Sequence, residues 1–397
     1  MIPGEIDRRE AVARAWDVLV VGGGPAGAMA ARELARSGRE VLLVDRSRFP
    51  RDKVCGACLN ARSLDLLARA GLLDQLVEVG ARPIAAFELV TAAGNARVDL
   101  PRGAALSRRR LDLVLIESAG RAGVRLLTGS RALLGPCEEG LRRVRLPEHG
   151  DELSARVVLA ADGLSGGFLP EAAMPRVAAG GSRLGAWAML EAGRDPQAGP
   201  PAGTIAMAVS EEGYVGAVRV EDGAINLAAA LDRGRVATHG LAGAVARILE
   251  QSGAVAPCPE AIRAASWRGT GPLTRRPLDV AMERVLLIGD AAGYVEPFTG
   301  EGMTWALESA LAVSPLAERA AAEWSPALAG EWRRTYGRAI ARRQRWCRWM
   351  ATGLRSPRWV HRAVRVLALS PRLAAPLVRK LGGRDSVRMA EPAEVWP

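Results

Sequence analysis

Histidine and cysteine, the residues that most often hold metals or form disulfide bonds, are scarce in this chain of 397 residues. The three histidines, His149, His239 and His361, lie too far apart in the sequence to suggest a ligand set. The five cysteines are an odd number and scattered, and no signal peptide precedes them, which favours a reducing cytoplasm over a secreted fold. We therefore expect no metal site, no structural disulfide bond and a cytoplasmic location.

The chain also lacks any uninterrupted run of about 18 apolar residues, so the sequence predicts no membrane-spanning helix. It has no acidic residue between positions 332 and 384, although the whole chain carries 54 basic and 43 acidic residues. Four tryptophans lie among the arginines of this segment: Trp332, Trp346, Trp349 and Trp359. Two interpretations stay open, namely peripheral contact with the inner face of an anionic membrane, or helices packed on the rest of the protein beneath a solvated arginine face. Nothing resembles a nucleic-acid-binding module, so nucleic acid is not an expected partner.

A glycine-rich turn lies between an apolar run at 18–21 and an alanine-rich helical stretch that reaches Ser37. In this turn, Gly22 permits a tight bend, Gly24 lets the backbone approach a phosphate, and Gly27 lets the helix contact the strand. The sequence therefore predicts a strand, a phosphate-binding turn and a helix.

A second apolar run at 41–44 ends in Asp45, at the spacing expected for a carboxylate that accepts ribose hydroxyls. An acid at this position favours a free 2′-hydroxyl, as in FAD or NAD, over NADPH. Two later apolar runs also end in an acid beside glycine, at Asp162-Gly163 and at Gly289-Asp290. We expect both to return to the same sheet.

With these motifs the chain resembles the group A flavoprotein monooxygenase superfamily, the p-hydroxybenzoate hydroxylase fold, which also contains geranylgeranyl reductases and flavin-dependent halogenases. The resemblance covers about residues 16 to 325 and implies FAD as the cofactor. It places Asp290 at the ribityl chain, Arg108 near the cofactor, and a helix from about Met303 with its positive end towards the flavin. The residues that we expect at FAD are Gly22, Gly24, Pro25, Ala26, Gly27, Asp45, Arg46, Lys53, Val54, Cys55, Gly56, Arg108, Asp162, Gly163, Gly289, Asp290, Pro297, Gly300, Glu301, Gly302 and Met303.

The segment 49–56 is most similar to the reductase branch, in which a lysine or arginine and a Cys-Gly pair lie close to the flavin. The resemblance thus implies Lys53, Cys55 and Tyr214 as the catalytic residues. Of the reductases' Tyr-x-Trp-x-Phe-Pro motif, however, only Tyr214 is present, and the halogenases' lysine and Trp-x-Trp-x-Ile-Pro element are missing. Cys55 and Cys58 also form a CxxC pair, and a redox-active dithiol is an alternative to a small buried cysteine at 58.

We expect an α/β protein made of a Rossmann-like FAD-binding domain, an antiparallel-sheet substrate domain and a helical C-terminal tail. The expected boundaries are 1–82, 101–181 and 264–325 for the FAD-binding domain, 83–100 and 182–263 for the substrate domain, and 326–397 for the basic tail. Turn residues predict a three-stranded meander over 203–209, 214–220 and 224–231, then a helix over 238–251 and an extended return over 263–277.

The function that we expect is FAD-dependent oxidoreduction of a lipophilic small molecule, such as an alkylated phenol, polyketide or isoprenoid, with NADH or NADPH as a transient reductant. The leading expectation is monooxygenation through a flavin C4a-hydroperoxide. The alternative is reduction of carbon–carbon double bonds, as in geranylgeranyl reductases. Halogenation and electron delivery to a partner protein at a membrane surface are further alternatives.

Overall fold

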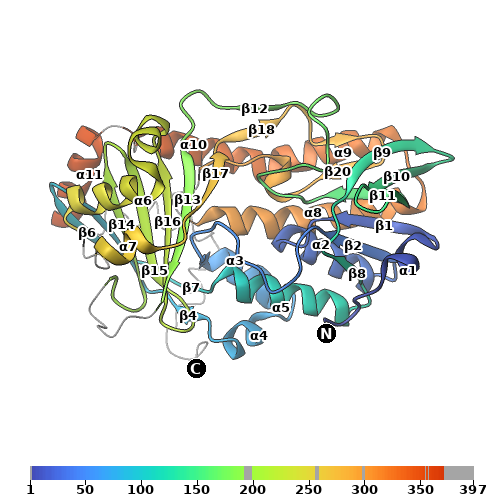
Figure 1. Cartoon of the computed structure of the whole chain (residues 1–397), viewed down its shortest axis with the longest axis horizontal. Helices are drawn as coiled ribbons and strands as arrows, with labels where there is room; N and C mark the ends of the chain where they lie inside the picture. Colours follow the sequence, from blue (N-terminus) through green and yellow to red (C-terminus); the bar gives the residue numbers. More distant parts are fainter. Residues whose placement is uncertain are drawn as a thin grey trace.

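The computed structural model describes residues 2–191, 199–254, 259–296, 300–353, 355 and 357–370. Its larger layer is an eight-stranded sheet, on the right in Figure 1, with the order β19-β20-β11-β1-β2-β8 and with β10 and β9 attached to β11. The strands of this sheet are β1 (Ala15–Val21), β2 (Val41–Asp45), β8 (Arg125–Thr128), β9 (Leu133–Glu138), β10 (Leu141–Leu146), β11 (Asp151–Ala160), β19 (Ala281–Met282) and β20 (Val285–Leu287).

The central strands β1, β2, β11 and β20 run parallel, as we expected from the apolar runs that end in glycine or an acid. All of β2 and most of β1 are buried, because helices cover both faces of such a sheet. The helices of this layer are α1 (Arg8–Val12), α2 (Pro25–Arg36), α3 (Ala61–Arg69), α4 (Leu73–Glu78), α5 (Arg108–Arg121), the 3₁₀ turn η1 (Gly289–Ala292), α8 (Glu301–Ala322) and α9 (Pro326–Tyr336). Helix α2 packs between α5 and α8.

The second layer is a seven-stranded sheet, on the left in Figure 1, with the order β17-β13-β16-β15-β14-β5-β6. Its strands are β5 (Ala86–Thr91), β6 (Gly94–Asp99), β13 (Leu184–Leu190), β14 (Thr204–Ser210), β15 (Gly213–Arg219), β16 (Ile225–Leu231) and β17 (Arg268–Pro272). The antiparallel meander β14-β15-β16 confirms the prediction from the turn residues. Two details differ, since β5 pairs with β14 in parallel and β17 joins this sheet beyond the expected boundary at 263.

Helix α6 (Arg233–Ser252) covers one face of this sheet, followed by α7 (Pro259–Ala264). The helix that we expected from residue 238 begins earlier, at the cap Asp232, and it bends at Gly240, whose φ of 67° is left-handed. Two small sheets join the layers: β3 (Cys58–Asn60), β7 (Gly103–Ala105) and β4 (Arg82–Pro83) form one, and β12 (Arg176–Ala178) and β18 (Arg275–Pro277) form the other.

The C-terminal region is helical as far as it is described. A π-helical turn η2 (Gly337–Ala341) joins α9 to α10 (Arg342–Gly353), and α11 (Pro357–Leu369) follows. Helix α11 begins at one of the prolines that we expected to divide this region. None of the described helices combines the length and the apolar composition that a membrane span requires.

Candidate FAD and substrate site

A cavity of about 1320 Å³ lies between the two sheets and reaches from the glycine-rich turn after β1 to the inner face of the seven-stranded sheet. Residues far apart in the chain line it, among them Gly24, Arg108, Asp162, Asp290 and Tyr214. Topology explains this convergence, because the carboxyl ends of parallel strands meet at one edge of a sheet and ligands bind in the crevice outside that edge.

The glycine-rich turn is shaped for close packing. Gly22 has a φ of 109°, and a Cβ atom there would overlap the carbonyl oxygen of Ala161. A Cβ atom on Gly27 would overlap the carbonyl oxygen of Gly22, so a larger residue would not fit where α2 approaches the end of β1. Gly24 instead faces the cavity, where a Cβ atom would have Nη2 of Arg108 as its nearest neighbour, at 3.6 Å. The turn thus leaves backbone accessible to a phosphate at Gly24.

Asp45, at the end of β2, holds the loop that follows the strand. Its Oδ2 accepts a hydrogen bond from the Gly23 amide at 2.7 Å, and its Oδ1 accepts one from the Ser47 amide at 2.8 Å. A guanidinium nitrogen of Arg51 lies 3.4 Å from the same carboxylate. Asp45 lines the cavity at the place where a ribose would lie in a dinucleotide fold.

Several cations face this part of the cavity. Burial and the positive charges of Arg51, Arg108 and Arg46 lower the pKa of Lys53, whereas Asp290 opposes the shift. Burial also works against the charge of Arg108, but the carboxylate of Asp112, at 2.7 Å from its Nε, holds the pKa of Arg108 above its ordinary value. Positive charge in excess of nearby carboxylates fits a pyrophosphate, which would relieve the repulsion. This donor set fits FAD.

Two acids complete the wall. Burial raises the pKa of Asp290, although Arg108, Lys53 and Arg275 oppose the shift. Asp162 accepts a hydrogen bond from the Phe168 amide at 2.9 Å, and its buried Oδ1 has no partner within the described part of the chain. Burial raises the pKa of Asp162 as well. An unpartnered acceptor atom at the cavity fits a hydroxyl group of a bound ribityl chain or ribose.

The loop that carries Cys55 is fixed from the other sheet. The side-chain amide of Asn226, on β16, donates to the carbonyl oxygen of Cys55 at 3.0 Å, and Nε1 of Trp187 donates to the Asn226 Oδ1 at 2.7 Å. The thiol of Cys58 donates to the Gly56 carbonyl, and burial raises the pKa of this thiol. Cys55 and Cys58 are both free thiols in the structure.

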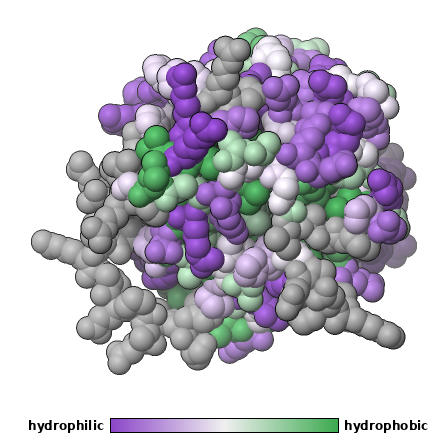
Figure 2. Space-filling model, turned by 90° about the vertical axis from the view of Figure 1, so that its left-hand side faces the viewer, coloured by the Kyte–Doolittle hydropathy of each residue, from purple (hydrophilic) through white to green (hydrophobic). Residues whose placement is uncertain are grey.

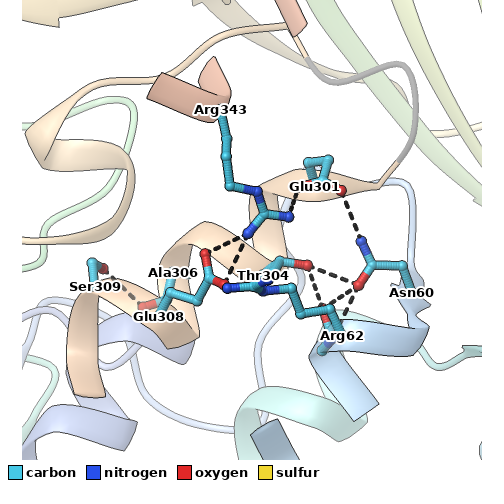
Figure 3. Close-up of polar contacts among 9 residues, drawn as sticks. Asn60, Arg62, Glu301, Thr304, Ala306, Glu308, Ser309 and Arg343 are labelled. Atoms are coloured by element: carbon cyan, nitrogen blue, oxygen red, sulfur yellow. Dashed lines mark hydrogen bonds and ion pairs between the residues drawn. The ribbon is translucent and has the colours of Figure 1, made fainter. Parts of the chain in front are cut away.

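The first turn of α8 is held by a polar network of side chains from the start of α3, from α8 and from α10 (Figure 3). Arg343, from α10, donates to Glu301 at 2.8 Å and to Glu308 at 2.7 Å. Asn60 donates to Glu301 at 3.3 Å, and Arg62 forms an ion pair with Glu308. Burial raises the pKa of Glu301 to about 7; Arg343 opposes this shift and Glu308 adds to it. The C-terminal region thereby fixes the start of the helix that points at the cavity.

Tyr214 and Tyr294 both line the cavity. Tyr214 hydrogen-bonds to Glu296, and Arg183 lies 3.2 Å from the same carboxylate and 5.5 Å over the Tyr214 ring. Burial raises the pKa of each tyrosine well above 10, with a further rise from Glu296 at Tyr214 and from Asp290 at Tyr294. Both phenols therefore stay protonated near neutral pH and are able to donate a hydrogen bond or a proton.

Most of the residues that we predicted at FAD line this one cavity, together with the predicted catalytic residues Lys53, Cys55 and Tyr214. Gly27, Gly289 and Glu301 do not line it: both glycines serve close packing, and Glu301 turns towards Arg343. Pro297 lies outside the described residues. Arg51, Asn226 and Tyr294 also lie at this site but were not predicted from the sequence, because their positions become informative only when the sheets are placed. The proximity of Tyr294 to Asp290 in the sequence was the one available signal.

Fold and site together define a flavin-dependent oxidoreductase. The chain belongs to the FAD binding domain family, whose model matches residues 15–318. This agrees with the fold, the cofactor and the enzyme class that we expected from the sequence.

Curated relatives include reductases and monooxygenases. The chain is 37% identical to a menaquinone reductase of Mycobacterium tuberculosis over 158 residues, which is 37% of either chain. It is 27% identical to digeranylgeranylglycerophospholipid reductase 1 of Methanothermobacter thermautotrophicus over 332 residues, which is 77% of this chain and 78% of the other. It is 29% identical to a rifampicin monooxygenase of Rhodococcus hoagii over 151 residues, 37% of this chain and 31% of that one. The matched part thus spans about a third of the menaquinone reductase.

Solved structures with the same fold include halogenases. A variant of a flavin-dependent brominase superposes with a TM-score of 0.74 at 16% identity and covers 94% of this chain and 95% of its own. A myxobacterial chondrochloren halogenase gives a TM-score of 0.72 at 22% identity, with 94% and 91% covered. Both likenesses show the fold.

Proposed function

We propose that this FAD-dependent oxidoreductase acts on a lipophilic small molecule with a long apolar chain and reduces a carbon–carbon double bond in it, with NADH or NADPH as the reductant. The observation that carries the proposal is the chemistry of the cavity wall on the seven-stranded sheet. Of the described residues that β13 to β16 contribute to this wall, Tyr214 alone is titratable. The others are glycine, alanine and larger apolar residues: Gly185, Ala186, Ile205, Met207, Gly216, Ala217, Val218, Ala228, Ala229 and Ala230.

A wall of small apolar residues leaves room for a bulky substrate and binds it by excluding water. The described residues that β13 to β16 contribute to this wall include no cation that could bind a carboxylate or phenolate group of a substrate. The names of two relatives are in keeping with such a substrate, because menaquinone and digeranylgeranylglycerophospholipid both carry long isoprenoid chains. The second of these relatives aligns with 77% of this chain.

Bound FAD would supply the hydride-transfer chemistry. Saturation of a double bond also needs a proton on the second carbon, and the half-buried phenol of Tyr294 is a protonated donor at the cavity. Tyr214 is a second phenol, but Glu296 already accepts a hydrogen bond from it. We therefore assign the proton to Tyr294, the positioning of the substrate to Tyr214, and the binding of the FAD pyrophosphate to Lys53 and Arg108.

Monooxygenation, which the sequence favoured, is the second candidate, and the rifampicin monooxygenase relative supports it. Turnover of a polyprenyl quinone and of a geranylgeranyl lipid, with NADH or NADPH, followed by mass spectrometry of the product, separates the two. The reductase adds two hydrogens and works without oxygen. A product with one added oxygen atom, formed in air alone, would overturn the proposal in favour of the monooxygenase. Reduction of the flavin without any product would favour an electron carrier.

A further inference from the structure

Helix α11 forms part of the cavity wall at the end of the molecule farthest from the Rossmann-like sheet (Figure 1). It packs on β5 and β6, where Val360 and Val364 are buried in one apolar cluster with Leu89 and Ala96. Trp359, Val360, Ala363 and Leu367, on the same helix, line the cavity. The apolar chamber thus continues from the seven-stranded sheet to the C-terminal helix.

Trp359 lies at the rim of this chamber, because it lines the cavity and is also 65% exposed. Arg362 lies over its ring at 5.6 Å. Leu369, also on α11, is 89% exposed, and Trp349, on α10, is 79% exposed. Large apolar side chains are therefore exposed on α10 and α11, and one of them, Trp359, lines the cavity.

The charges on these helices have one sign. The exposed ionisable residues described on α10, on α11 and between them are arginines: Arg342, Arg345, Arg355, Arg362 and Arg365. No acidic residue occurs between 332 and 384. Figure 2, which looks onto this end of the molecule, shows apolar residues in green next to strongly hydrophilic residues in purple. In water such a surface exposes apolar area, and its arginines repel one another. At an anionic bilayer, tryptophans enter the interface and arginines pair with lipid headgroups.

We propose that the α10–α11 surface docks on an anionic lipid bilayer and that a lipophilic substrate passes from the bilayer into the cavity at the Trp359 rim. The docking stands on the surface alone. The passage of substrate rests on the proposed function, because it requires a substrate that partitions into lipid. An acidic carrier protein would pair with the arginines but would leave no reason for Trp349 and Leu369 to be exposed, so the observations favour lipid.

Sedimentation of the full-length, FAD-loaded protein with vesicles tests the docking. We expect binding to vesicles of phosphatidylcholine mixed with phosphatidylglycerol, and little binding to phosphatidylcholine alone. Replacement Trp349→Ser with Trp359→Ser, or Arg362→Gln with Arg365→Gln, should weaken vesicle binding about tenfold or more. The matched controls are Leu278→Ser, an apolar residue that is 69% exposed elsewhere, and Arg9→Gln with Arg36→Gln, which removes the same charge from exposed positions on α1 and α2.

Wild-type protein that stays in the supernatant with anionic vesicles would overturn the docking. Equal vesicle binding by the wild type and the tryptophan variant would also overturn it. The same holds if the protein sediments only with a second copy of the chain or with an acidic protein, and not with lipid.

The passage of substrate is tested with Trp349→Ser, which lies outside the cavity wall. We expect this variant to turn over a detergent-solubilised isoprenoid substrate like the wild type and a vesicle-embedded one several-fold more slowly. Equal rates in vesicles would overturn the passage. If the wild-type protein turns over the substrate neither in detergent nor in vesicles, the proposed function is wrong. The docking would then be judged from the sedimentation result alone.

Discussion

The side-chain amide of Asn226 donates a hydrogen bond to the carbonyl oxygen of Cys55 at 3.0 Å, across the junction between the two sheets. Asn226 lies on β16, in the middle of the substrate sheet, whereas Cys55 lies in the loop that follows β2. Nε1 of Trp187 donates a hydrogen bond to Oδ1 of the same Asn226 side chain. A strand that lines the apolar chamber thereby holds the loop expected next to the flavin.

Replacement Asn226→Ala should lower the free energy of unfolding by about 1–3 kcal/mol, because Nε1 of Trp187 and the Cys55 carbonyl would both lose a buried partner. It should also change the visible spectrum of bound FAD. Urea unfolding and absorbance measure the two effects. Asn95→Ala, at an exposed position on the edge strand β6, is the control, and an equal loss of stability there would contradict the special role of Asn226.

Replacement Lys53→Met should weaken FAD binding about tenfold or more, since a charge-assisted hydrogen bond to a phosphate would be lost. The pKa of Lys53 is lowered by burial and by neighbouring arginines, so affinity for FAD should also fall as the solution becomes alkaline, at a lower pH than for an ordinary lysine. Titration of FAD by fluorescence quenching at several pH values tests both points. Arg110→Met, an exposed neighbour on α5, should bind FAD like the wild type.

Glu301 makes stability depend on pH. Its pKa rises from 4.5 to about 7 because of burial, so the folded chain holds this proton more tightly than the unfolded chain does. The resulting stabilisation is fully present below pH 4.5 and is lost as pH rises through about 7. Glu301→Gln should remove a slope worth up to about 3 kcal/mol over this range. Urea unfolding of FAD-free protein across the range measures it, with the exposed Glu323→Gln as the control; an unchanged slope would refute the assignment.

Tyr294→Phe should slow product formation about a hundredfold if its phenol supplies the proton. Reduction of the flavin by NADH or NADPH should continue, because that step does not use the substrate proton. Rapid-mixing absorbance follows the flavin and mass spectrometry follows the product. If Tyr214→Phe abolishes product and Tyr294→Phe does not, the two roles are exchanged.

Cys58→Ser should keep turnover close to the wild-type rate. Burial raises the pKa of the Cys58 thiol, and a protonated thiol is a poor partner for disulfide exchange with Cys55. Steady-state oxidation of NADH or NADPH in the presence of substrate measures the effect. A large loss in both Cys55→Ser and Cys58→Ser would instead support the dithiol that the CxxC spacing allows.

Local signals were enough to predict many of the residues that meet at the cavity. The turn at Gly22 to Gly27 and the acids at 45, 162 and 290 all follow apolar runs, and parallel strands bring such ends together. The meander was predictable because its turns carry glycine and acidic residues between short strands. Each of these features depends on neighbours in the sequence.

Features that depend on distant contacts were not predictable in this way. Arg343 reaches Glu301 only because α10 packs back on the start of α8, and the pairing of β17 with β13 depends on the placement of the whole second sheet. Glu301 lies in a segment that the sequence predicts at the flavin, between Gly300 and Gly302. Its side chain nevertheless forms an ion pair with the guanidinium of Arg343, from the C-terminal region. Side-chain direction at a helix start is set by packing, which a linear pattern does not contain.

The parallel pairing of β5 with β14 joins segments that are far apart in the chain, and the intervening residues include helix α5 and strands β8 to β11 of the other layer. The polypeptide crosses between the layers repeatedly before either sheet is complete. Before such distant segments pair, the chain must lose the conformational entropy of the long loop between them. We therefore expect folding to be slow and strongly cooperative. The two layers differ in architecture, but we expect them to form one folding unit, so that neither should fold as a transferable module.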